Sequence, residues 1–142
     1  MNTVNYDDEA FRETSLYSNF QKENPASANL NIRASSANLS VPISGVKIIV
    51  SKNIGDYKVI FFDGITDMSG MINNIKLPTP SLITNDLDVP NGIIYDVEAI
   101  YDLDNIDRIY KVLMYPGICV VQNINLIPSL KVSGEGEFES GS

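Results

Sequence analysis

The sequence predicts an all-β protein, a β-sandwich of about seven antiparallel strands with an N-terminal extension. Two observations predict this class. Short segments of alternating polar and apolar residues recur after residue 28, and turn-forming Gly, Pro, Asn and Asp residues separate them. Almost no segment has the periodicity of a helix. We therefore expect an extension over residues 1–27, a sandwich domain over 28–130 and a flexible tail over 131–142.

The size and charge of the chain exclude several classes of function. Its 142 residues fit one domain that can bury a core without disulfides. The formal net charge of −8 disfavours binding to nucleic acids and to anionic membranes, which requires clustered Lys and Arg. The sequence contains no His, the commonest general base and zinc ligand. We expect no cofactor and no catalytic residues.

The first 27 residues are polar and lack the basic and apolar regions of a Sec signal peptide. No apolar run reaches the 18 residues of a membrane span, so we expect cytoplasmic synthesis and no membrane insertion. Phe11, Leu16 and Phe20 would form one apolar stripe on a short helix within residues 8–21. We take these three as candidate contacts with a protein partner. Packing of the same side chains back onto the domain is the alternative.

The first half of the domain contains three clear strands. Residues 28–34 alternate strictly, with Leu30, Ile32 and Ala34 on one face, and strands over 46–51 and 57–62 follow. The stretch from Gly64 to Gly70 is a tight reversal. Asp and Ser in it can bond nearby backbone, and Gly allows a positive φ. We expect the strands on either side of it to pair with each other.

The second half predicts four more strands, after a less regular start. Residues 71–77 form a strand that two Asn residues weaken, and a proline-containing loop follows as far as Gly92. Strands over 93–101, 108–115 and 118–127 complete the count. Cys119 lies in the apolar run of the last strand, so we expect a buried thiol that acts as a small apolar side chain.

The order of several motifs resembles a known family. They are Leu30-Asn31-Ile32, Val41-Pro42-Ile43-Ser44-Gly45-Val46 and Thr66-Asp67-Met68-Ser69-Gly70. This order resembles the carboxypeptidase-regulatory-like, or prealbumin-like, β-sandwich. The later segments 95–99 and 115–128 are similar to the non-catalytic β-domain of clostridial spore cortex-lytic proteins. The resemblance covers about residues 28–128.

The resemblance implies a β-sandwich fold and a spore setting, and carries no activity. The catalytic domain of the cortex-lytic proteins has no counterpart in this sequence. Two segments depart from the family pattern: Gly45-Val46 replaces the usual Gly-Ala, and residues 102–107 replace a usual Gly-Tyr pair.

An acidic turn holds the best candidates for metal ligands, Asp102, Asp104 and Asp107. Calcium prefers several carboxylate and amide oxygens on one loop, and Asn105 lies within this one. The spacing is not that of an EF-hand, so a solvated acidic turn is the favoured interpretation. Asp86 and Asp88 would add ligands only if their loop met this turn.

Other chemistry has less support in the sequence. A carboxylate pair for glycoside hydrolysis arises easily by chance among 18 acidic residues. A Ser or Cys nucleophile would lack His as its base. Aromatic side chains that could stack on sugars are more typical of a sandwich core; they are Tyr57, Phe61, Phe62, Tyr95, Tyr101, Tyr110 and Tyr115.

These observations favour a non-enzymatic interaction or structural module of a spore or cell-envelope assembly. Its partner would be another protein or a second copy of the chain, and peptidoglycan is a further candidate. The alternative is a structural subunit of a phage-like or other self-assembling particle. A glycan-binding module and a small hydrolase are less favoured.

Overall fold

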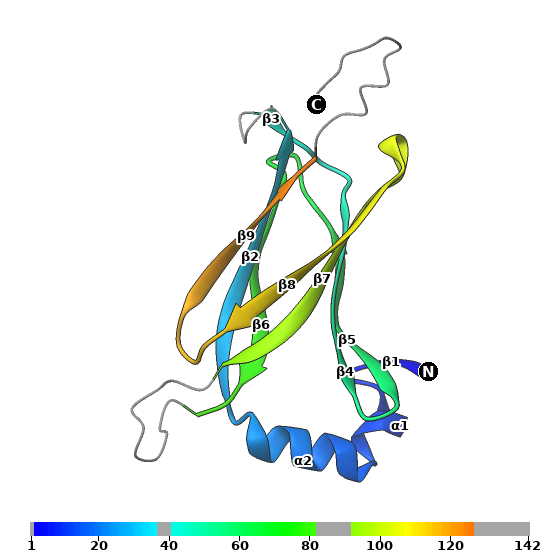
Figure 1. Ribbon diagram of the computed structural model, residues 1–142, viewed down its shortest axis with the longest axis vertical. Coiled ribbons are helices and arrows are strands. Elements are labelled where there is room, and N and C mark those ends of the chain that lie inside the picture. The colour runs from blue at the N-terminus through cyan, green and yellow to red at the C-terminus, as the bar shows by residue number, and fades with distance from the viewer. Residues whose placement is uncertain (1, 37–40, 82–91, 127–142) are drawn as a thin grey trace.

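The chain folds as an all-β sandwich of two sheets, as the sequence predicts (Figure 1). The structure is a computed structural model that describes residues 2–36, 41–81 and 92–126. The first sheet has five strands, in the order β1 (Asn2–Asn5), β5 (Tyr57–Ile65), β4 (Lys47–Ile54), β7 (Ile93–Tyr101) and β8 (Ile106–Met114). The second sheet contains β9 (Cys119–Asn125), β2 (Ala26–Ser36), β6 (Met71–Thr79) and the two-residue β3 (Val41–Pro42).

The core lies between the two sheets, and the alternation of the sequence builds it. Leu30, Ile32 and Ala34 of β2 face Tyr95 and Val97 of β7 across the sandwich, and all five are fully buried. Removing one large side chain from such a core costs about 2–5 kcal/mol. The Tyr95 hydroxyl donates a hydrogen bond of 2.6 Å to the carbonyl of Pro78, so the ring is fixed at its polar end as well.

All seven predicted strands are present, and two further short strands, β1 and β3, join them. The sheets are mixed rather than purely antiparallel. Strand β1 runs parallel to β5, and β9 runs parallel to β2. Ser35 of β2 pairs with Pro42 of β3 on one side and with Asn125 of β9 on the other, so β3 and β9 lie on opposite sides of β2.

The tight turn at 67–70 is confirmed, but the expected pairing around it is wrong. Asp67 Oδ1 accepts hydrogen bonds from the amides of Ser69 (2.9 Å) and Met71 (3.0 Å), and Gly70 has a φ of 73°. Strands β5 and β6 nevertheless belong to different sheets. The turn carries the chain from one sheet to the other, because β5 pairs with β4 and β6 pairs with β2.

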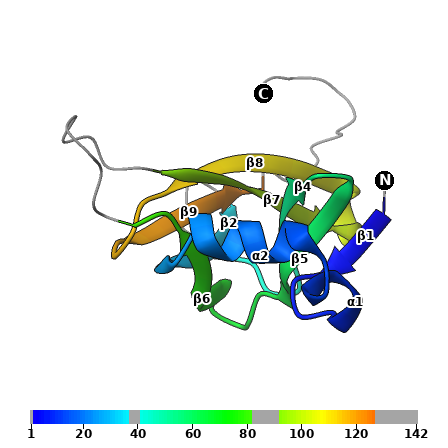
Figure 2. The ribbon, with the colours of Figure 1, turned by 90° about the horizontal axis from the view of Figure 1, so that it is seen from below.

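Helices α1 (Glu9–Arg12) and α2 (Ser15–Glu23) form where a single short helix was expected. Helix α2 lies across one end of the sandwich, as Figures 1 and 2 show. The hydroxyl of Thr14 accepts from the amide of Tyr17 at 3.3 Å and so caps the start of α2. Residues 2–24 therefore lie on the sandwich, and β2 begins at Ala26, two residues before the expected start of the domain.

The acidic turn folds as a 3₁₀ helix, η1 (Asp102–Asp104), that ends at Asn105 with a left-handed φ of 53°. The predicted tail over 131–142 lies outside the described residues. Within the part of the chain that is described, the helices are too short and too polar to cross a bilayer.

Candidate functional site

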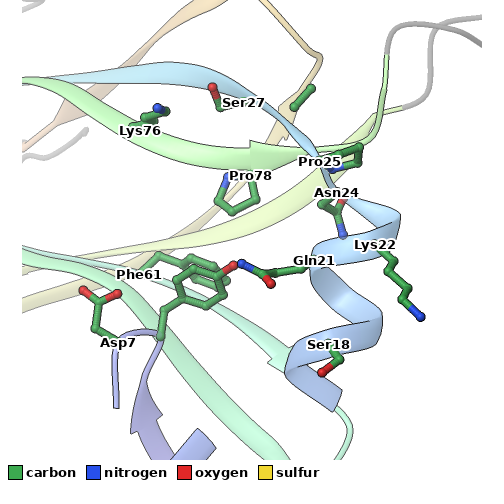
Figure 3. A pocket seen from close by; sticks show the side chains of 12 residues that line it. Asp7, Ser18, Gln21, Lys22, Asn24, Pro25, Ser27, Phe61, Lys76 and Pro78 are labelled. Atoms are coloured by element: carbon green, nitrogen blue, oxygen red, sulfur yellow. The ribbon is translucent and has the colours of Figure 1, made fainter. Parts of the chain in front are cut away.

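A groove lies beside α2, where the N-terminal segment meets the edge of the second sheet (Figure 3). We call it the α2 groove; its volume is about 840 Å³. The helix supplies one wall and strands β2 and β6 the other, while two aromatic rings lie between them. The residues that line it include Tyr6, Asp7, Ser18, Gln21, Lys22, Asn24, Ser27, Phe61, Lys76 and Pro78.

The rings of Tyr6 and Phe61 stack on each other at the centre of the α2 groove. Their centroids are 4.6 Å apart and their planes differ by 27°. Phe61 also contacts Tyr95 edge-on at 5.1 Å, and Tyr6 contacts Phe20 at 6.0 Å, so the pair is held by the core behind it. Burial, followed by the neighbouring Tyr17, raises the pKa of Tyr6, which remains a neutral hydrogen-bonding group.

The walls of the α2 groove are polar and carry mixed charge. Asp7 forms an ion pair of 2.8 Å with Arg12, while Lys22 and Lys76 are exposed. The side chain of Asn24 is buried and donates to the carbonyl of Phe20 at 2.9 Å. Asp7 is the one carboxylate among the lining residues that the structure describes, so the groove lacks there the carboxylate pair of a glycosidase. The arrangement suits binding of a polar ligand, with rings to stack on and amides and ammonium groups to bond.

A pair of neighbouring carboxylates occurs elsewhere, on the outer face of the first sheet. A side-chain hydrogen bond with Asp107 raises the pKa of Glu98, and partial burial and the charge of Asp107 raise it further. Lys58 and Lys47 act in the opposite direction. The two carboxylates lie on adjacent strands of an exposed face, and neither lines a described pocket. We therefore assign the pair no catalytic role.

The candidate metal ligands of the acidic turn are described only in part, because the side chain of Asp104 lies outside the described residues. Across residues 2–36, 41–81 and 92–126, no three Asp, Glu or Cys side chains come together as a metal-binding group, Asp102 and Asp107 included. Asp107 lies instead beside Glu98, on strand β8. Asp86 and Asp88 also lie outside the described residues.

The prediction of a buried Cys119 is wrong. Its thiol is exposed on β9, where the side-chain amide of Asn31 donates to the sulfur at 3.5 Å. The apolar run around it belongs to an edge strand, and alternate residues of that strand point away from the core.

The candidate contact residues of the N-terminal segment also need correction. Phe11 is 0% exposed and Phe20 is 6% exposed, both packed among aromatic rings of the domain. Leu16 is half-buried and lies against the turn at Gly55. The alternative from the sequence holds for Phe11 and Phe20, whose buried side chains close the domain itself and are not available to a partner.

A second candidate surface lies on the side of the sandwich formed by the edge strands β8 and β9. We call it the open side. Strand β8 pairs with β7 along nine residues, and no described strand pairs with its other edge. Apolar side chains are exposed on both sheets at this side. They are Ile94 of β7 and Ile109 and Leu113 of β8 on the first sheet, and Ile118 and Val121 in and just before β9 on the second. Arg108 reaches from β8 to the carbonyl of Asn125 on β9 at 3.1 Å and ties the two edges together.

Sequence reasoning identified one part of these two surfaces. Phe61 belongs to the aromatic set considered for sugar stacking, and it lines the α2 groove. Tyr6 and Gln21 were missed, because nothing in the local pattern indicates that the N-terminal segment folds back on β5. Exposed sandwich edges were expected as contact surfaces, but not which strand would be the edge, since strand order does not follow from periodicity.

The sequence matches no protein-family model and no curated protein. Similar solved structures include transthyretin from Sparus aurata, with a TM-score of 0.39 and 19% identity over 68% of this chain and 90% of that chain. Another is the dioxygenase domain of a dioxygenase and carbohydrate-binding protein fusion from Streptomyces sp. SirexAA-E, with a TM-score of 0.43 and 8% identity over 91% of each chain.

Both TM-scores are below 0.5 and both identities are below 25%, so neither likeness indicates a function for this chain. The β-sandwich class follows from the two sheets of the structure itself. The more specific similarity to cortex-lytic proteins is not shown by these matches and stays a prediction.

Proposed function

We propose that this chain is a non-enzymatic β-sandwich module that attaches to other protein chains through its open side. The observation that carries the proposal is the edge of β8, nine residues long with one described neighbour strand. Such an edge offers a row of unpaired amide and carbonyl groups to a further strand.

The side chains on the open side support the same function. Ile109 is 64% exposed and Leu113 is 45% exposed, at alternate positions on the outer face of β8. Ile94 lies directly opposite Leu113 on β7, so apolar surface extends away from the edge. Side chains of a strand added to β8 would pack beside Ile109 and Leu113 on this face, while its backbone bonds the edge. Both contributions favour a protein partner over a small ligand.

The setting that we propose is a spore or cell-envelope assembly. Its basis is the similarity of segments 95–99 and 115–128 to the β-domain of spore cortex-lytic proteins. Lack of catalysis is part of the proposal, because the α2 groove offers one carboxylate among its described lining residues and the sequence has no His.

Co-sedimentation with purified spore envelopes tests this function. We expect the full chain to sediment with the envelopes and the double variant Ile109→Lys/Leu113→Lys to remain in the supernatant. Ile65→Lys is the matched control, because Ile65 is also 64% exposed but lies at the end of β5. Equal sedimentation of all three proteins would refute attachment through the open side. Release of muropeptides from the same envelopes would refute the non-enzymatic assignment.

The α2 groove supports a second candidate, binding of a glycan. Aromatic rings at its centre can stack on a sugar ring, and the amide of Gln21 and the ammonium of Lys76 can bond its hydroxyls. Titration with soluble muropeptides, followed by NMR, would perturb amide signals of α2 and β6 if this is correct. Shifts confined to other strands, or no shifts at millimolar ligand, would contradict it.

A further inference from the structure

The edge strand β8 has a sequence that is complementary to itself. Around Ile109, residues at equal distances form favourable pairs: Asp107 with Lys111 and Ile106 with Val112. The remaining pair is Arg108 with Tyr110, a cation and an aromatic ring. A strand with this property can pair with an identical strand that runs in the opposite direction.

Geometry limits the ways in which two β8 edges can meet. Directly opposite residues of an antiparallel pair point to the same face of the sheet. A two-fold axis between identical strands therefore passes through one residue and not between two. The realistic centres are residues 108, 109, 110 and 111, each of which gives a different set of opposed side chains.

Charge separates these four registers. A centre at 108 or at 111 places Arg108 opposite Arg108, or Lys111 opposite Lys111, and like charges directly opposite destabilise a pair. A centre at 110 places Lys111 opposite Ile109 and Asp107 opposite Leu113, so neither charged side chain lies opposite one of the other sign. A centre at 109 opposes Asp107 to Lys111 twice and leaves no like charges opposed.

We propose that β8 pairs antiparallel with β8 of a second copy, centred on Ile109, so that two five-stranded sheets become one of ten strands. The inference rests on the proposed function, because it names the partner of the same open edge. On the outer face, Ile109 would meet its own copy between two Asp107–Lys111 pairs. On the inner face, Ile106 would meet Val112.

The charged groups already present on this face are compatible with the pairing. Lys111 bonds Asp96 at 2.7 Å, yet its side chain is 70% exposed and its ammonium can face a second carboxylate. Asp107 lies beside Glu98, with Lys47 and Lys58 acting on the pair from a distance. Lys111 of the second copy would bring a further cation next to these two carboxylates.

One feature of the edge opposes association. A lysine on an edge strand and a charged residue at an inward position, here Lys111 and Arg108, are devices that keep edges apart. Arg108 already donates to β9 at 3.1 Å, so its charge is engaged within the chain. An edge that pairs with itself and an edge that its charges keep apart differ in one measurable property, the oligomeric state of the purified full chain.

Sedimentation equilibrium on the full chain provides the first test. We expect a monomer–dimer equilibrium that weakens with salt, because two charge pairs contribute to it. Asp107→Lys and Lys111→Asp each oppose like charges at both positions, and each should weaken dimerisation about tenfold or more. A mixture of the two variants restores both charge pairs in the heterodimer, so mixing should recover association. A monomer at every concentration, or no recovery on mixing, overturns the proposal.

The register has its own readout in a Cys119→Ser background, which removes the exposed native thiol. Opposed residues of an antiparallel pair have Cα atoms about 4.5–5.5 Å apart, so Ile109→Cys should give a disulfide-linked dimer on copper-catalysed air oxidation. Leu113→Cys, with its two copies about 27 Å apart in this register, should not. Cross-linking at 113 and not at 109 would refute the centre at Ile109.

The two proposals fail in different ways. If the chain stays monomeric while Ile109→Lys/Leu113→Lys abolishes sedimentation with envelopes, self-pairing is refuted and attachment through the open side stands. If dimers form with the predicted charge rescue but Ile109→Lys/Leu113→Lys sediments with envelopes as the unchanged chain does, attachment through the open side is refuted and self-pairing stands.

Discussion

The two edges of the five-stranded sheet differ in which other segments of the chain cover them. At one edge, the four-residue β1 runs parallel to β5, and the segment behind it buries Phe11 among aromatic rings. At the other edge, β8 exposes Ile109 and pairs with β7 alone among the described strands. Both edges belong to one sheet of similar alternating sequence. The difference shows that closure depends on which distant segment reaches an edge, and not on the edge strand itself.

The largest expected effect lies at the closed edge, in Phe11→Ala. Phe11 is fully buried against Tyr6, Tyr17 and Tyr57, so its removal should lower the free energy of unfolding by about 3–5 kcal/mol. Ile109→Ala at the open edge should change it by about 0.5 kcal/mol or less in the monomer. Urea denaturation of both variants at low protein concentration measures the contrast. Equal losses would mean that the two edges do not differ in closure.

A pair of glycines sharpens the comparison without removing any side chain. Gly55 and Gly117 both have left-handed backbone, with φ of 59° and 79°. A Cβ at Gly55 would lie 2.8 Å from the Leu16 side chain, whereas one at Gly117, on the open side, would meet nothing within 4 Å. Gly117→Ala should cost about 1 kcal/mol from backbone strain alone, and Gly55→Ala about 1 kcal/mol more.

Thermal unfolding of the two glycine variants gives the measurement, with the wild type in the same buffer. If Gly55→Ala were no worse than Gly117→Ala, helix α2 would not press on the β4–β5 turn, and the closed edge would be looser than described.

The helix cap separates the contribution of α2 from that of the buried rings. The Thr14 hydroxyl accepts from the Tyr17 amide and donates to the Phe11 carbonyl at 2.7 Å. Thr14→Ala should cost about 1 kcal/mol, and Thr14→Ser, which keeps both bonds, should cost little. Chemical denaturation would compare them. A loss in Thr14→Ser as large as in Thr14→Ala would mean that the threonine methyl, and not the cap, stabilises this edge.

The smallest expected change in the free energy of unfolding concerns Glu98 on β7, next to the edge strand β8, and it depends on pH. The folded chain raises the pKa of Glu98 above its ordinary value, so ionised Glu98 destabilises the fold at neutral pH. This cost is lost as the pH falls through the raised pKa. Glu98→Gln should therefore stabilise the fold by a few tenths of a kcal/mol at pH 7, and the gain should vanish in acid. Asp107→Asn should give the same pH dependence; a gain that persists in acid would contradict the cause.

The sequence allowed most strands to be predicted, because alternation marks a half-buried strand wherever it lies. Strand β1 was not predicted: its residues are polar or small, and its pairing partner β5 begins 55 residues later. The destination of Phe11 and Phe20 was left between two alternatives for the same reason. Cys119 was misplaced because an apolar run does not reveal whether its strand is central or at an edge. The crossover at Asp67 has the same local chemistry as a hairpin turn.

The candidate sites show the same limit. The residues of the α2 groove come from three separate strands, from α2 and from the segments that flank this helix, so no spacing in the sequence connects Tyr6 with Phe61 or Pro78. The charge symmetry around Ile109, by contrast, is a pattern of neighbouring residues in the sequence. It acquires a meaning once β8 is known to be an edge, which is a property of the strand order.

The pairing of Asn2 with Tyr57 has a consequence for the chain during its synthesis. A ribosome adds about 5–20 residues per second, so β5 follows β1 by roughly 3–11 s. Throughout that interval Phe11 and Phe20 have no sheet to cover them, and they are exposed to whatever else is nearby. The segment that closes the finished domain is thus a part of the nascent chain that needs protection, and a general holding chaperone would find its binding motif around these two rings.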